Sequence, residues 1–253
     1  MAVRIPNSPR VIYAKNPLTE VIVQVRFPPI LAIAERTPSD FQEAIRERFP
    51  RFGEVVFEIA ASPIASPTQT RSYQFGSDDG VWTVTLTREF LALTTTRYDR
   101  WEAFAAQLRA PLEALFNVYR PHATDRIGLR YVDLVRREPL DLAGVPWTEL
   151  IQPWVLGEWR ELASEDDVQG YVSDILLKLD GDARVRLRHG LASHEGEIGY
   201  RIDTDFFVEA SRAKSVDEVF QVLHPFNGLS GRLFRSLIRE KLHAAMEPQE
   251  VSP

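Results

Sequence analysis

The alternation of apolar and polar residues is clearest between positions 16 and 29, in the segment NPLTEVIVQVRFPP. Val21, Val23 and Val25 share one parity, and Gln24 and Arg26 share the other, which predicts a β-strand with one apolar face. Prolines bound the segment on both sides because proline has no amide hydrogen to donate inside a sheet. We therefore expect a central strand here, around which the other strands are organised.

Further strand and helix patterns follow this segment along the chain. Strand patterns lie at residues 54–59, 71–75, 81–87, 90–96, 125–136, 171–179, 183–189 and 198–208, and helical patterns lie at residues 38–49, 101–115 and 215–246. The order of the first half, strand, helix, strands, helix and strand, is that of an elaborated ferredoxin-like unit. The predicted fold class is α+β, with an extended antiparallel sheet in two packed halves and helices covering one side.

The boundary between the two halves is expected in residues 137–170. This segment contains three prolines, the acidic run Glu165-Asp166-Asp167 and three of the five tryptophans. The prediction is an N-terminal α+β half at residues 1–136 and a C-terminal half, a β-meander plus a helix, at residues 137–246. The two halves pack as one globule, and residues 247–253 form a disordered tail.

The turn near Asp180 sets the register of two strands in the second half. A three-residue loop, Asp180 to Asp182, places Ile175 opposite Leu187 and Leu177 opposite Val185. A two-residue loop would instead place Leu177 opposite Arg184, which mixes an apolar and a charged face. The three-residue loop is therefore predicted.

Composition narrows the classes of protein that the chain can belong to. The formal net charge of −6 disfavours a general polyanion binder, which needs a concentrated positive surface. The absence of cysteine excludes disulfides, thiol catalysis and cysteine-ligated zinc. No run approaches the roughly 18 apolar residues of a membrane helix, and no apolar segment follows the first residues, so we expect a cytoplasmic protein.

Two segments resemble a known family. NPLTEV at residues 16–21 and RIGLRYVD at residues 126–133 are similar to an uncharacterised prokaryotic family described as sporadically distributed, and the resemblance extends over most of the chain. No activity is established for that family, so the resemblance implies no catalytic residues. Its patchy distribution suggests a mobile or defence-linked gene.

One candidate site combines charged residues of the two strongest strands. Arg26 and Arg130 each occupy a polar position of an otherwise apolar strand, with Glu20 and Asp133 nearby in the sequence. If the two strands are neighbours, these four side chains form an ion-pair network that joins the halves. The alternative is a site that recognises an anion or another ligand.

A second candidate lies on the strands of the second half. Arg201, Asp203 and Asp205 share one strand face, and a neighbouring strand presents its own row of arginines, Arg184, Arg186 and Arg188. We expect a solvated cross-strand ladder of opposite charges. The alternative is a metal-dependent hydrolase that uses Asp203 and Asp205 together with His189 and His194.

The tryptophans of the boundary segment form a third candidate. Trp147, Trp154 and Trp159 lie between prolines and acidic residues, where neither a core strand nor a long helix is expected. They form either a lid that packs on the sheet or a partner surface. We predict that at least one of these rings is partly exposed in the isolated protomer.

The function predicted from these features is a non-enzymatic binding or interaction protein of the bacterial cytoplasm. The chain has no Gly-rich phosphate loop, no G-x-S-x-G and no HExxH, and it implies no cofactor. The expected partner is another protein or a second copy of the chain, and no membrane is involved. The alternatives are an RNA-binding or RNA-processing protein with ferredoxin-like units, where the net charge disfavours nucleic acid, and the metal-dependent hydrolase.

Overall fold

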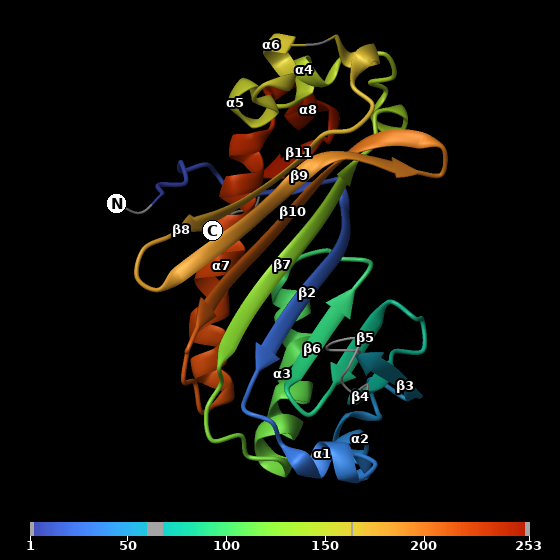
Figure 1. The fold of residues 1–253 in the computed structure, drawn as a ribbon, viewed down its shortest axis with the longest axis vertical. Coiled ribbons are helices and arrows are strands. Elements are labelled where there is room, and N and C mark those ends of the chain that lie inside the picture. The colour runs from blue at the N-terminus through green and yellow to red at the C-terminus, as the bar shows by residue number, and fades with distance from the viewer. Residues whose placement is uncertain (1–2, 60–67, 163, 251–253) are drawn as a thin grey trace. The chain divides into compact units, whose positions relative to one another are not determined.

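The computed structural model describes residues 3–59, 68–162 and 164–250 of the chain. Across these residues it is an α+β protein with a nine-stranded antiparallel sheet and helices, which confirms the predicted fold class (Figure 1). The strands are β1 (Val11–Tyr13), β2 (Leu18–Arg26), β3 (Arg51–Ile59), β4 (Thr68–Gly76), β5 (Trp82–Leu86), β6 (Phe90–Thr95), β7 (Arg126–Val135), β8 (Val172–Lys178), β9 (Ala183–His194), β10 (Glu197–Glu209) and β11 (Pro248–Glu250). The helices are α1 (Leu31–Glu35), α2 (Ser39–Ile45), α3 (Trp101–Val118), α4 (Trp147–Leu150), α5 (Pro153–Leu156), α6 (Trp159–Leu162), α7 (Val216–Leu237) and α8 (Glu240–Ala245).

The strand order of the large sheet is β3-β4-β5-β6-β2-β7-β10-β9-β8, and β1 pairs with β11 in a separate two-stranded sheet. The chain divides into two compact units that are not consecutive in sequence. Unit 1 contains Met1–Thr19, Arg130–Phe207 and His224–Pro253, and unit 2 contains Glu20–Leu129 and Val208–Leu223. These bounds differ from the predicted division at residue 136, because β7 and α7 each begin in unit 2 and end in unit 1.

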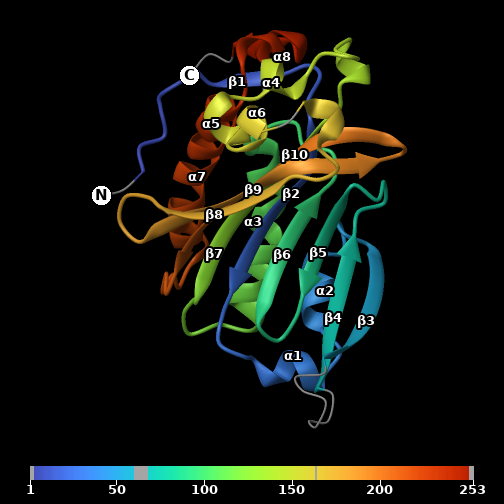
Figure 2. The same ribbon diagram turned by 45° about the horizontal axis from the view of Figure 1, so that its top comes forward.

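Unit 2 is built on the predicted central strand. Val21, Val23 and Val25 of β2 are fully buried, as the alternation predicted, and Val23 lies opposite Leu93 of β6. The long helix α3 lies behind these strands in Figures 1 and 2 and buries Phe104, whose ring lies 5.5 Å from that of Trp82. The ferredoxin-like arrangement of this part stays a prediction.

Unit 1 contains the C-terminal end of β7 together with β10, β9 and β8. The β8–β9 register pairs Ile175 with Leu187 and Leu177 with Val185, so the predicted three-residue loop is confirmed. The C-terminal part of α7 packs against one face of these strands, where the ring of Phe226 lies 5.9 Å from that of Phe206. One side of this sheet is therefore covered by a helix.

The C-terminal tail is ordered where the structure describes it. Pro248–Glu250 form β11, which pairs with β1, and the amide of Lys15 donates to the carbonyl of Met246 at 3.1 Å. The prediction of a disordered tail is wrong for these residues, because an extended N-terminal segment supplies backbone partners that the local sequence does not reveal. Residues 251–253 lie outside the described part. Among the described helices, none is long and apolar enough to cross a membrane.

Candidate functional site

A cluster of charged residues in unit 1 lies on the face of its sheet opposite α7. On β10, Tyr200, Ile202 and Phe206 are buried, and Arg201 and Asp203 point to the other side because alternate residues of a strand face opposite ways. Figures 1 and 2 show no described helix in front of the central part of β7 and β10. We call this surface the open face, and its charged residues include Arg130 of β7, Arg201 and Asp203 of β10, Arg186 and Arg188 of β9, and Asp174 of β8.

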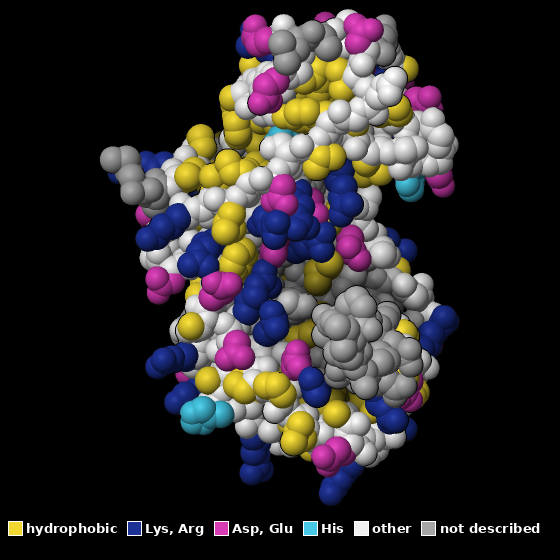
Figure 3. Space-filling view, in the orientation of Figure 1, with side chains coloured by type: hydrophobic (Ala, Val, Ile, Leu, Met, Phe, Trp, Pro, Cys, Tyr) yellow, Lys and Arg dark blue, Asp and Glu magenta, His cyan; other side chains and the backbone are white. Residues whose placement is uncertain are grey.

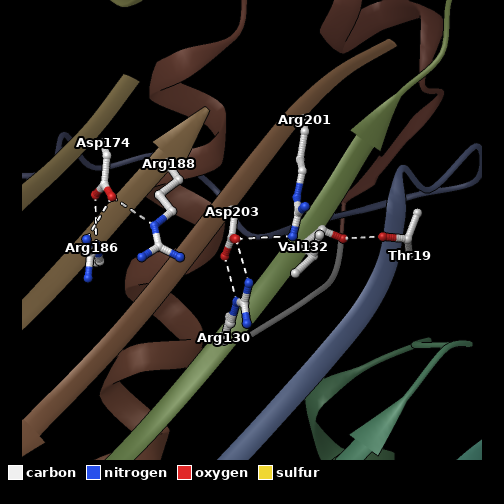
Figure 4. Close-up of polar contacts among 8 residues, drawn as sticks. All are labelled: Thr19, Arg130, Val132, Asp174, Arg186, Arg188, Arg201 and Asp203. Atoms are coloured by element: carbon white, nitrogen blue, oxygen red, sulfur yellow. Dashed lines mark hydrogen bonds and ion pairs between the residues drawn. The ribbon is translucent and has the colours of Figure 1, made fainter. Parts of the chain in front are cut away.

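Asp203 is the buried centre of the open face. Arg130 donates from Nε to Oδ1 and from Nη2 to Oδ2, both at 2.7 Å, and Arg201 donates from Nη2 to Oδ2 at 3.3 Å (Figure 4). Asp203 is only 4% exposed, and these guanidinium groups lie against its carboxylate. A two-pronged arginine–carboxylate pair of this kind keeps a buried charge fully hydrogen-bonded.

Asp174 forms a second centre at the edge of the sheet. Arg186 donates from Nε and Nη2 to its two carboxylate oxygens at 2.8 Å, and Arg188 donates from Nε to Oδ2 at 3.0 Å. The hydrogen bond from Arg186 is the largest cause that lowers the pKa of Asp174 to about 2, and Arg188 adds to it. The carboxylate is therefore ionised at neutral pH and fixes both arginines in place.

The open face carries an excess of positive charge. Four guanidinium groups face the carboxylates of Asp203 and Asp174, and Arg184 and Asp205 add one charge of each sign on the same side of β9 and β10. Among these eight residues, positive charges exceed negative ones by two, in a chain whose formal charge is −6. Arg188 uses only Nε, so its two terminal nitrogens have no protein partner among the described residues while its side chain is 46% exposed. Figure 3 shows Lys and Arg side chains gathered where these strands cross the centre of the view.

Of the predicted network of Glu20, Arg26, Arg130 and Asp133, the structure places Arg130 beside Asp203. Arg130 and Asp133 lie on opposite faces of β7, because an odd offset of three residues reverses the direction of a side chain. Asp133 is instead buried on the covered face, 5% exposed, and burial raises its pKa to about 8. Glu20 is half-buried and Arg26 is exposed on β2 in unit 2. That these residues join the two halves stays a prediction.

The structure also corrects two details of the expected solvated ladder of charges on β9 and β10. Asp203 is buried rather than solvated, and its first partner is Arg130 rather than an arginine of β9. Asp174, which the sequence analysis did not single out, holds Arg186 and Arg188. The predicted β8–β9 register could have identified Asp174, because this pairing places it directly opposite Arg188.

The residues proposed for a metal-dependent hydrolase are not brought together. His189 is buried on the covered face, where its Nδ1 lies 2.8 Å from the hydroxyl of Tyr200 and burial lowers its pKa to about 4. Asp203 faces the opposite side of the sheet, and His194 is exposed at the end of β9. Among the described residues, no group of three or more His, Cys, Asp or Glu side chains is placed to hold a metal ion.

The three tryptophans of the boundary segment have different environments. Trp147 and Trp159 are buried, and their rings lie 5.4 Å from those of Tyr200 and Tyr171 respectively. Trp154 is 61% exposed, which confirms the prediction that at least one ring is accessible in the isolated protomer. The segment is thus a lid on the covered face, with one indole turned to solvent.

Comparison with known proteins adds no family. No protein-family model matches the chain, and a search of curated proteins finds no match. The resemblance of residues 16–21 and 126–133 to the sporadically distributed prokaryotic family therefore stays a prediction.

Proposed function

We propose that this chain is a non-enzymatic interaction protein whose open face binds the acidic surface of another protein. The observation that carries the proposal is the half-exposed Arg188, which is fixed through Nε by Asp174 and presents its terminal N–H groups without a protein partner among the described residues. A carboxylate of a partner would accept two of these N–H groups side by side, which is the geometry that the guanidinium group favours.

The arginines of the open face are already ordered before any partner binds. Arg130 and Arg186 are each held by two hydrogen bonds to a carboxylate, and Arg201 by one. Immobilising a long side chain on binding costs roughly 0.5–1.5 kcal/mol, and these arginines are already held in place by the fold. The open face therefore suits a partner that supplies several negative charges in fixed positions.

Charge favours a protein over a nucleic acid as the partner. A nucleic-acid surface requires many positive charges to neutralise a row of phosphates, whereas the open face has an excess of two in an acidic chain. The exposed Trp154 also fits a protein interface, in which tryptophan and arginine are enriched. The resemblance to a prokaryotic family and the absence of cysteine support a place in the bacterial cytoplasm, from a mobile or defence-linked gene.

The test is fluorescence anisotropy with a labelled polyglutamate peptide and a labelled single-stranded polyuridine of equal length. We expect the peptide to bind more tightly, with an affinity that falls as salt rises. Arg188→Ala should weaken peptide binding by about tenfold or more, because hydrogen bonds to charged groups contribute about 1.5–3 kcal/mol.

Arg160→Ala is the matched control. Arg160 lies in unit 1, is comparably exposed and forms a single ion pair with Glu161, so its replacement changes the net charge equally. An equal loss of affinity in both variants would show that only the net charge matters, and it would overturn the proposal that the open face is the binding site. Tighter binding of polyuridine would replace the proposal with an RNA-binding protein.

A further inference from the structure

Asp174 is an acid on the same surface for which we propose an acidic partner. It lies on β8, directly opposite Arg188 of β9, and its side chain is 37% exposed. By charge alone, an acid in this position should repel an acidic ligand. Its hydrogen bonds, however, determine which atoms of the neighbouring arginines a ligand can contact.

Asp174 binds its two arginines in different ways. Arg186 donates to it from both Nε and Nη2 at 2.8 Å, whereas Arg188 donates from Nε alone at 3.0 Å. A guanidinium group is a planar fork of N–H donors, so a contact through Nε leaves the two terminal nitrogens together on the outer edge of the fork. Two parallel N–H groups on such an edge match the two oxygens of one carboxylate. Arg188 is therefore the arginine of this pair that is held in place and still presents a complete edge.

A second carboxylate lies on the other side of Arg188. β9 is placed between β8 and β10 in the sheet, and Figure 4 shows the side chain of Arg188 between those of Asp174 and Asp203. Without Asp174, Arg188 would be free to turn its terminal nitrogens toward Asp203, the nearest remaining acid, and to pair within the protein. The contact through Nε thus keeps the outer edge of Arg188 open to a ligand.

We propose that Asp174 is a positioning residue for the acidic partner, because it holds Arg188 with its terminal N–H groups open to a carboxylate of that partner. This inference rests on the proposed function of the open face and adds the residue on which its affinity depends. It predicts that removing an acid, which makes the chain less negative, weakens the binding of an acidic ligand. A surface that acted only through its net charge would respond in the opposite direction.

Fluorescence anisotropy of the full chain with the labelled polyglutamate peptide tests the sign of this effect at constant pH and salt. We expect Asp174→Asn to weaken peptide binding by about three- to tenfold, because the partner must then immobilise Arg188 itself. Asp174→Glu keeps the charge and a carboxylate acceptor, so it should retain more affinity than Asp174→Asn. Thermal unfolding should change little in both variants, since ion pairs of this exposure contribute little to stability.

Glu161→Gln is the matched control for charge. Glu161 is an exposed acid of unit 1 that pairs with Arg160 at 3.7 Å, and its replacement changes the net charge by the same amount. We expect this variant to bind the peptide as tightly as the unmodified chain, or slightly more tightly.

A double-mutant cycle shows whether Asp174 acts through Arg188. In a chain that already carries Arg188→Ala, Asp174→Asn should cause no further loss of affinity, because the side chain that it positions is absent. Peptide binding by Asp174→Asn that equals or exceeds that of the unmodified chain would overturn the inference and leave the proposed function in place. An equal loss in the presence and absence of Arg188 would also overturn it. If the unmodified chain did not bind the peptide, the proposed function would fail, and the inference would fail with it.

Discussion

Two carboxylates on neighbouring strands of unit 1 are almost equally buried but have opposite environments. Asp203, on the open face of β10, is enclosed by Arg130 and Arg201, whereas Asp133, on the covered face of β7, has a pKa raised to about 8. Burial and the nearby negative charge of Asp203 are the causes of the Asp133 shift. His189, also on the covered face, is kept neutral by burial in the same way.

The contrast shows that the exposed fraction of a side chain does not determine which groups surround it. Desolvation disfavours the charged form of each group, and only hydrogen bonds from an opposite charge reverse that effect. The open face provides guanidinium groups, and hydrogen bonds from Arg186 and Arg188 lower the pKa of Asp174 there to about 2. The covered face packs apolar and aromatic side chains, so its titratable groups are held in their neutral forms.

The largest expected effect comes from removing the guanidinium group beside Asp203. Arg130→Leu should lower the free energy of unfolding by about 2–4 kcal/mol, because a buried carboxylate loses its two-pronged partner and Arg201 replaces only part of it. Urea denaturation measures this change. Arg160→Leu, an exposed arginine of the same unit, is the control and should change stability by less than about 1 kcal/mol. A value near zero for Arg130→Leu would show that the pair is not structural.

Asp133, on the covered face, should make the stability of the protein depend on pH. The folded-state pKa of about 8 exceeds the ordinary value of 3.8, so between these values the unfolded chain releases a proton that the folded chain retains. Stability therefore falls as pH rises from about 4 through about 8, by about 2 kcal/mol between pH 6 and pH 8. Asp133→Asn cannot titrate, and thermal or urea unfolding across this range should show the fall in the unmodified chain only. Parallel curves for the two proteins would mean that Asp133 is ionised in the folded state.

His189 should have the opposite effect at acid pH, and a somewhat smaller one. Its pKa is lowered from 6.5 to about 4, so between these pH values His189 is protonated in the unfolded chain and neutral in the folded chain. Stability is thus lost as pH falls from about 6.5 to about 4, by roughly 1–2 kcal/mol between pH 7 and pH 5. His189→Gln retains a hydrogen-bonding partner for Tyr200 and should lose this component of the acid sensitivity. Comparing it with Asp133→Asn in one buffer series separates the contributions of the two residues. If His189→Gln lost as much stability as the unmodified chain between pH 7 and pH 5, His189 would not be the source of that loss.

The alternation of residues along single strands determined much of what the structure contains. It placed Val21, Val23 and Val25 in the core, and it gave the β8–β9 register through a loop of three residues. It also indicated that Asp203 shares a face with Arg201. These features depend on residues close in sequence, and the two-residue period of a strand is sufficient to order them.

Only the tertiary structure decided how the charges are paired and which are buried. Arg130 and Asp203 are 73 residues apart, and the sequence does not state that β7 and β10 are neighbours. The same limit applies to Trp154, which is exposed while Trp147 and Trp159 of the same segment are buried. Local pattern fixes the direction of a side chain relative to its own strand. The neighbour that it meets, and therefore its solvation and charge, depends on strand order and on the elements that cover each face.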